Sequence, residues 1–178
     1  IYRDRSEASL RDYVVTLEDF DALLRSRYPA AEDTVVPPKL EVYLVGSVQQ
    51  LRRVWPAAPG RIGGFYTAGY GGIFAVAVRD AGGRLTDTTN GDDVVLHEYV
   101  HHFMMQYLGA SYPPWLIEGY AEYYATVDLG PKKITVGTPH EGRVYALNSP
   151  GWLPMRDLLS KRIGDLQEKE IRNFYAQS

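Results

Sequence analysis

Three of the four histidines of the chain lie within six residues, in the segment His97-Glu98-Tyr99-Val100-His101-His102. This segment contains the pattern H-E-x-x-H. Four residues advance an α-helix by about 400°, so His97 and His101 would project from one face, one turn apart. Two imidazoles at this spacing can hold one metal ion. Glu98, one step round the helix, can reach a water molecule beside the metal without being a ligand. The pattern therefore predicts a metal site with a candidate general base.

The residues around this segment help to choose between two interpretations. In one, the helix carries polar residues that have no function, and in the other it holds a metal ion. The three ionisable groups lie among the apolar residues Val94, Val95, Leu96, Val100, Phe103 and Met104. Burying them in such surroundings costs free energy unless they are paired or bind a metal. The composition of the segment therefore favours the metal site.

A catalytic zinc ion takes three protein ligands and keeps one position open. The chain has no cysteine, which excludes thiolate ligands. The elongated metzincin pattern requires Gly at position 104 and His at position 107, where this chain has Met104 and Tyr107. The remaining candidates are the carboxylates of the next predicted helix. Glu118 and Glu122 are four residues apart there and share one face.

The combination of H-E-x-x-H with W-L-x-E-G-x-A at Trp115–Ala121 resembles the gluzincin metallopeptidases. The longer motif W-L-x-E-G-x-A-E-Y at Trp115–Tyr123 is most similar to the bacterial peptidase-MA-like domains. The specific motifs cover residues 94–125. Weaker similarity extends over most of the chain, at Phe65–Gly69, Trp152–Pro154 and Phe174–Ser178.

This resemblance implies a zincin-like α+β fold and a zinc-dependent peptidase that hydrolyses peptide bonds. Glu118 matches the third zinc ligand. Glu122 matches an acid that supports the first histidine, where thermolysin-like members carry Asp; the alternative is a surface acid. Glu98 would take a proton from zinc-activated water and pass it to the leaving amine. Tyr175 is the candidate oxyanion donor, because aminopeptidase N-like members bring a tyrosine from a downstream helix; the alternative is packing at the core edge.

Other residues near the motifs receive more structural interpretations. His102 lies about 100° round the helix from His101, so it is predicted to be structural or to support the site rather than to bind the metal. Gly119 removes a side chain next to Glu118 and should permit close approach of the two helices. His140 lies in a predicted loop, where it is either an exposed residue or a substrate contact near the cleft.

The apolar periodicity predicts the elements that must position this site. Helices are predicted over 9–27, 47–54, 92–108, 113–128, 153–160 and 166–175, and strands over 39–45, 62–68, 72–78 and 132–137. Ile73–Val78 is apolar throughout, so it is predicted to be buried on both faces. It is also predicted to border the cleft and to accept an extended peptide by edge pairing. The expected architecture is a small mixed sheet, an active-site helix beneath it, and a following helix that carries the third ligand.

Composition excludes several other classes of protein. A chain of 178 residues and 20.0 kDa fits one domain, residues 1–178. The net charge of −3 and the pI of about 5.8 do not favour binding to nucleic acid. No apolar run reaches the roughly 18 residues that a transmembrane helix needs. The expected cofactor is Zn²⁺ and the expected partner is a peptide or protein substrate. The alternative is a non-catalytic, zincin-derived binding or scaffold module; the presence of three ligands and a base favours the enzyme.

The two ends of the sequence carry further expectations. Residue 1 is Ile rather than Met, and the last predicted helix has no capping residue. We therefore expect a longer native protein, from which an N-terminal targeting signal has been removed and whose C-terminal end is truncated at Ser178. We also expect a periplasmic or other extracytoplasmic location.

Overall fold

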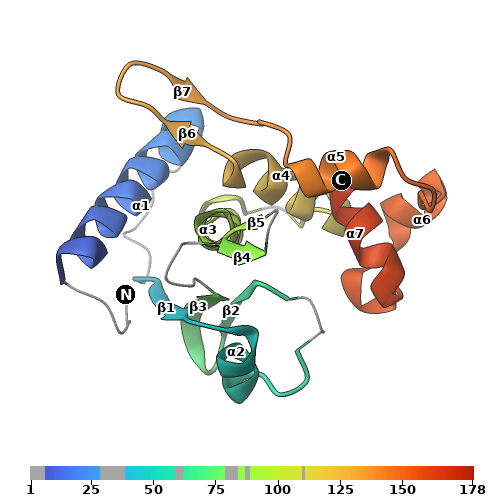
Figure 1. Cartoon of the computed structure of the whole chain (residues 1–178), viewed down its shortest axis with the longest axis horizontal. Coiled ribbons are helices and arrows are strands. Elements are labelled where there is room, and N and C mark those ends of the chain that lie inside the picture. Colours follow the sequence, from blue (N-terminus) through green and yellow to red (C-terminus); the bar gives the residue numbers. More distant parts are fainter. Residues whose placement is uncertain (1–6, 29–38, 59–61, 79–83, 87–88, 110) are drawn as a thin grey trace.

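The structure is a computed structural model of the chain, and it describes residues 7–28, 39–58, 62–78, 84–86, 89–109 and 111–178 (Figure 1). The helices are α1 (Glu7–Arg27), α2 (Val48–Val54), α3 (Gly91–Tyr107), α4 (Pro114–Ala125), α5 (Glu141–Leu147), α6 (Met155–Ser160) and α7 (Glu168–Gln177). The strands are β1 (Glu41–Val45), β2 (Gly64–Gly69), β3 (Gly72–Val78), β4 (Arg84–Thr86), β5 (Thr89–Asn90), β6 (Asp128–Leu129) and β7 (Ile134–Thr135). This mixture of helices and small sheets confirms the predicted α+β class.

The largest sheet in the described part of the chain has the strand order β1-β3-β2. β1 is parallel to β3, whereas β2 is antiparallel to β3, with Gly69 opposite Gly72 across the predicted turn. The sheet is therefore mixed, as predicted. The prediction that Ile73–Val78 is a free edge strand is wrong, because β3 forms backbone hydrogen bonds with a strand on each side. The edge strand that packs against α3 is β2.

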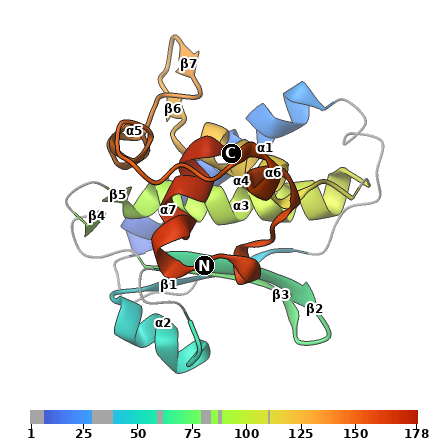
Figure 2. The same cartoon turned by 90° about the vertical axis from the view of Figure 1, so that its right-hand side faces the viewer.

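Helices cover the two faces of this sheet unequally. Figure 2 shows α3 running across one face with α4 beyond it, and α2 on the opposite face. Val76 and Val78 of β3 pack with Leu51 of α2. Ala77 faces the other way, into the main core. The residues Ala75–Val78 are at most 3% exposed, which confirms that this part of the strand is buried on both faces.

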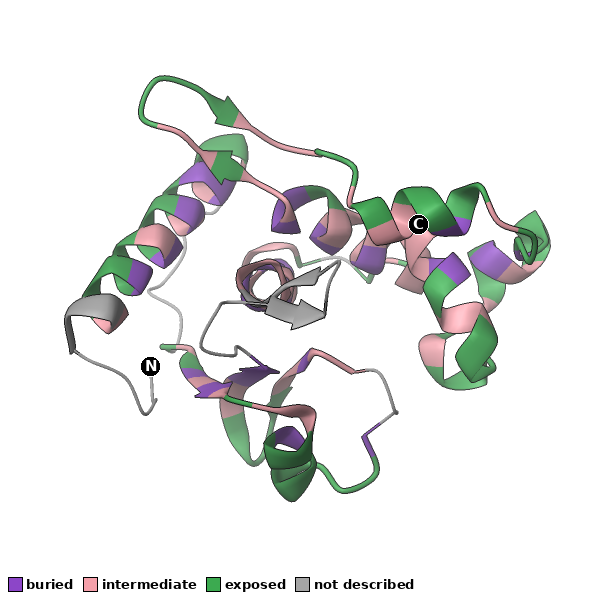
Figure 3. Ribbon diagram, in the orientation of Figure 1, coloured by how far each residue is buried: buried purple, intermediate pink, exposed green. Residues whose placement is uncertain are grey.

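The main core joins α1 to α3. Phe20 and Leu24 of α1 are completely buried in the same cluster as Val100 and Phe103 of α3. The buried residues of α1 recur every three or four positions, so one face of this helix packs inward (Figure 3). On the same face of α1, Asp21 accepts a hydrogen bond of 3.0 Å from the Tyr99 hydroxyl. α3 is therefore held from both sides, by the sheet and by α1.

The helices α5, α6 and α7 form a group on the side of α4 away from α1, whereas the β6–β7 hairpin lies beside α1 (Figure 1). Leu153, Leu158 and Phe174 make a small core of their own, against which Trp115 of α4 packs. Two features here differ from the prediction. α4 ends at Ala125 rather than near residue 128, because Asp128–Leu129 pairs with Ile134–Thr135 as a short hairpin. The predicted elements also contain no helix over Glu141–Leu147, where the structure has α5.

The segment before α3 also differs from the prediction, which gave no strand between residues 80 and 91. β4 and β5 form a short antiparallel pair there. α3 then begins at Gly91, with Asp92 and Asp93 in its first turn, where acidic side chains are favourable. None of the helices in the described part of the chain is both long enough and apolar enough to cross a membrane.

Candidate metal centre

α3 brings the two histidines of the H-E-x-x-H segment together, as helical spacing predicts. The Nε2 atoms of His97 and His101 lie 3.1 Å apart, and the two rings are nearly perpendicular. The opposite side of the helix is anchored by Val95, Val100 and Phe103, each at most 1% exposed. Because that apolar face is fixed in the core, the histidines must point the other way, towards α4.

α4 supplies the third group. Oε2 of Glu118 lies 3.1 Å from Nε2 of His97 and 3.4 Å from Nε2 of His101. The helix starts at the Pro113-Pro114 pair, with Pro in its first turn, and buries the small residue Ala121 against α3. The ligand atoms of His97, His101 and Glu118 all lie within 4.8 Å of one another. Of the two acids left open by the helix pattern, Glu118 faces the two Nε2 atoms.

Glu122, one turn further along α4, lies behind His97. Its Oε1 atom is 3.4 Å from Nδ1 of His97, so that nitrogen is occupied and Nε2 is left for the cluster. Arg143 of α5 holds the same carboxylate as a fork, with Nε 2.5 Å from Oε2 and Nη2 2.7 Å from Oε1. Burial alone would raise the pKa of Glu122, but the hydrogen bonds from Arg143 and His97 lower it to about 2. Glu122 is therefore not a plain surface acid.

The electrostatics of the cluster favour a cation at its centre. Burial alone would lower the pKa of His97, yet its hydrogen bonds to Glu118 and Glu122 raise it to about 10. Burial would likewise raise the pKa of Glu118, and the hydrogen bonds from the two histidines lower it to about 2. Two imidazole nitrogens and one carboxylate oxygen are a ligand set that catalytic zinc takes. The donor set and the occupied Nδ1 of His97 both fit that metal.

Glu98 points from α3 towards β2. It is 7% exposed, and its carboxylate accepts a hydrogen bond from the backbone N–H of Tyr66. Burial raises the pKa of Glu98, and the nearby His97 and His101 partly offset that rise. Gly64 allows β2 to lie close to α3, because a Cβ atom there would lie 3.2 Å from Cγ of Glu98 and 2.8 Å from Cγ1 of Val94.

Tyr175 of α7 lies beside the same cluster. Its ring centroid is 5.9 Å from that of His97, and the guanidinium of Arg143 lies 5.0 Å from the centre of its ring. Burial and the charges of Glu118 and Glu98 raise the pKa of Tyr175 well above its usual value. Its hydroxyl therefore remains a hydrogen-bond donor at any physiological pH. The structure brings Tyr175 to the site, and its role as an oxyanion donor stays a prediction.

The remaining two histidines lie outside the ligand cluster. His102 is 5% exposed, its Nδ1 atom is 3.3 Å from the Tyr66 hydroxyl, and burial lowers its pKa to about 4. This agrees with a structural or supporting residue. His140 is not an exposed loop residue: it is partly buried and caps α5, with Nδ1 accepting a hydrogen bond of 3.2 Å from Gly142. It lines a cavity of about 210 Å³ together with Glu122, so a substrate contact stays a prediction.

Gly119 does permit a close approach, but the neighbour is not the one expected. A Cβ atom at this position would collide with the backbone of Ser178, at the end of α7. Gly119 therefore admits α7 rather than α3.

Arg143 was missed by sequence reasoning. The only local signal was a Pro139-His140-Glu141 segment compatible with a helix start, and nothing in the sequence linked that segment to Glu122.

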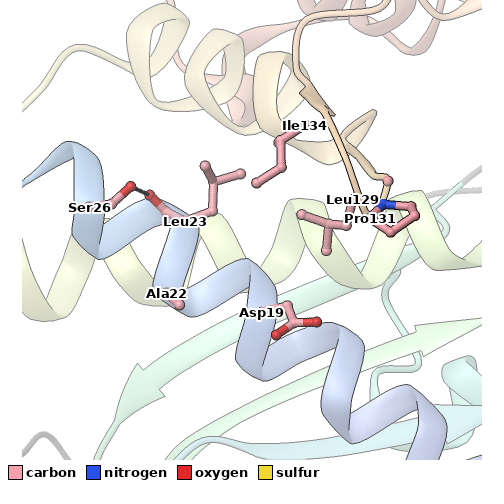
Figure 4. A pocket seen from close by; sticks show the side chains of 8 residues that line it. Asp19, Ala22, Leu23, Ser26, Leu129, Pro131 and Ile134 are labelled. Carbon is pink, nitrogen blue, oxygen red and sulfur yellow. Dashed lines mark hydrogen bonds between the residues drawn. The ribbon is translucent and has the colours of Figure 1, made fainter.

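A second cavity, of about 400 Å³, lies between α1 and the β6–β7 hairpin (Figure 4). Leu23 of α1 and Ile134 of β7 both face it, and Asp19 is the one ionisable residue of its lining. It contains none of the predicted site residues. The candidate ligands that the structure brings together are instead His97, His101 and Glu118.

Comparison of the chain with models of known protein families finds no matching family, and comparison with curated proteins finds no match. The function must therefore be inferred from the residues themselves and from the distances between them.

Proposed function

We propose that the chain is a zinc-dependent peptidase with a zincin-like fold of the gluzincin type. His97, His101 and Glu118 hold the zinc, and Glu98 is the general base. The observation that carries the proposal is the convergence of three ligand atoms within 4.8 Å from two helices, with a buried glutamate directly beside them. When bound, zinc polarises a peptide carbonyl and lowers the pKa of a water molecule towards about 7.

Glu98 has the properties that proton transfer requires. It takes a proton from the attacking water and delivers it to the leaving amine, which needs a carboxyl group whose pKa is closer to neutrality than that of a free glutamate. Burial provides that rise, and the N–H of Tyr66 fixes the direction of the carboxylate. Tyr175, which stays protonated, donates a hydrogen bond to the carbonyl oxygen as negative charge develops on it.

A peptide is the substrate class that the surroundings of Glu98 favour. In the described residues, β2 pairs with β3 on one side only. Its other side offers backbone N–H and C=O groups next to Glu98, and an extended peptide can add there as a further strand. This assigns the edge pairing expected of Ile73–Val78 to Gly64–Gly69 instead.

Zinc analysis combined with hydrolysis of an unstructured protein tests the proposal. We expect one zinc per chain in the wild type, and a Glu98→Gln variant that keeps the zinc but loses at least about 10²-fold in rate, because the amide cannot accept the proton. His101→Ala should lose the metal, whereas the control His140→Ala should keep it. A wild type that holds zinc without hydrolysis would point to the binding or scaffold module, and full metal retention in His101→Ala would refute the ligand set.

A further inference from the structure

We infer that Arg143 is a positioning residue of the metal centre, acting on His97 through Glu122. This inference rests on the proposed role of His97 as a metal ligand. Arg143 belongs to α5, outside both motif segments. Its guanidinium nevertheless contacts two groups that flank His97, the carboxylate of Glu122 and the ring of Tyr175.

The fork geometry fixes the orientation of Glu122. Two parallel hydrogen bonds from Nε and Nη2 of Arg143 hold both carboxylate oxygens of Glu122, which sets the plane of that group as well as its position. Oε1, one of the two held oxygens, is the atom 3.4 Å from Nδ1 of His97. Because Oε1 cannot rotate away, the N–H of His97 stays directed at it, and Nε2 stays directed at the ligand cluster.

The burial of the pair supports the same conclusion. The side chain of Glu122 is 20% exposed, and that of Arg143 is 33% exposed. Because the pair has little contact with water, water competes little with the two hydrogen bonds of the fork, and the carboxylate of Glu122 keeps its orientation.

A purely structural ion pair would have a different signature. Its removal would lower the stability of the fold but would leave the zinc affinity of the folded protein unchanged. A positioning residue that acts through Glu122 must lose its effect on zinc affinity once Glu122 is changed. The coupling between the two substitutions therefore distinguishes the two roles.

The experiment measures zinc affinity of the full chain by competition with a chromophoric chelator, with circular dichroism as the check on folding. Arg143→Met should bind zinc about 10- to 100-fold more weakly than the wild type. Arg143→Lys should fall between them, because it keeps the charge and loses the fork. The matched control is Arg172→Met, since Arg172 lies over the ring of Tyr145, 5.4 Å away, and should leave zinc affinity unchanged.

In a Glu122→Gln background, Arg143→Met should weaken zinc binding by less than about threefold. Wild-type affinity in Arg143→Met, or full additivity of the two substitutions, would overturn the inference while leaving the metal site intact. A wild type that binds no zinc would overturn the proposed function and the inference together. Where Arg143→Met does not fold, Arg143→Lys decides: an affinity equal to the wild type overturns the inference, and about 3- to 10-fold weaker binding supports it.

Discussion

Gly64→Ala is expected to damage catalysis and stability while leaving the metal in place. The added Cβ atom would lie 2.8 Å from Cγ1 of Val94, 2.9 Å from the carbonyl oxygen of Val76 and 3.2 Å from Cγ of Glu98. The carbonyl belongs to the backbone of the central strand and cannot rotate away. β2 must therefore move away from β3 or from α3, and Glu98 with its Tyr66 contact must adjust.

The size of the effect follows from these contacts. Overpacking of this kind costs about 1–3 kcal/mol, and the loss of glycine's freedom in the unfolded chain returns about 0.4–1 kcal/mol. We expect the free energy of unfolding to fall by about 1–2 kcal/mol. A displacement of Glu98 by a few tenths of an ångström should lower the rate of hydrolysis by about tenfold, since a 1 Å error can cost about 10²-fold.

Three measurements test this prediction: urea unfolding of the zinc-free protein, zinc content, and hydrolysis of an unstructured protein. Gly69→Ala is the matched control, because Gly69 lies in the same strand and a Cβ atom there meets nothing within 4 Å. Zinc content should equal that of the wild type in both variants, as the new methyl group points at no ligand. The reasoning is refuted if Gly64→Ala matches Gly69→Ala in stability and rate, or if it loses zinc.

Two further predictions concern groups at the edge of the cluster. Tyr175→Phe should lower the rate about 10²- to 10³-fold with zinc retained; a near-wild-type rate would mean that this ring only packs. Burial, together with the charges of Asp92 and Glu122, raises the pKa of Asp93 to about 6. The folded protein therefore holds this proton more tightly than the unfolded chain, and stability falls as pH rises from about 4 to about 6. We compare the free energy of unfolding of Asp93→Asn with that of the wild type, by urea unfolding of the zinc-free protein. Discounted for solvent screening, the difference in favour of the variant should be about 1 kcal/mol larger at pH 7 than at pH 4. A difference in stability between the two proteins that stays constant from pH 4 to pH 7 would contradict the raised pKa of Asp93.

Local periodicity accounts for the part of the site that the sequence predicted. His97, Glu98 and His101 follow from one helix, whose turn length fixes their directions. The choice between Glu118 and Glu122 depended on how two helices pack. The resemblance matches Glu118 to the third ligand. In the structure Glu118 meets the two Nε2 atoms and Glu122 meets Nδ1, and the binding of a metal stays a prediction.

The features that the sequence missed are all non-local. An apolar run such as Ile73–Val78 predicts burial, but it carries no information on which strands lie on either side. Gly119 signals a close approach without saying which element approaches. Arg143 sits in a helix of seven residues whose amphipathic pattern is short, and its partner is 21 residues away. Its role depends on packing that no local pattern encodes.

The distribution of the site along the chain has a consequence for how it assembles. His97 and Glu118 are 21 residues apart, and closing a loop of that length costs less entropy than closing a longer one. The hydrogen bond that ties α3 to α1, from Tyr99 to Asp21, spans 78 residues. The three proposed zinc ligands thus belong to one helical hairpin, and a metal that binds only the paired hairpin would stabilise it as the chain folds. The orientation of Glu98 depends on its contact with β2, a strand of the sheet. The proposed ligands can therefore be in place before the proposed base is oriented.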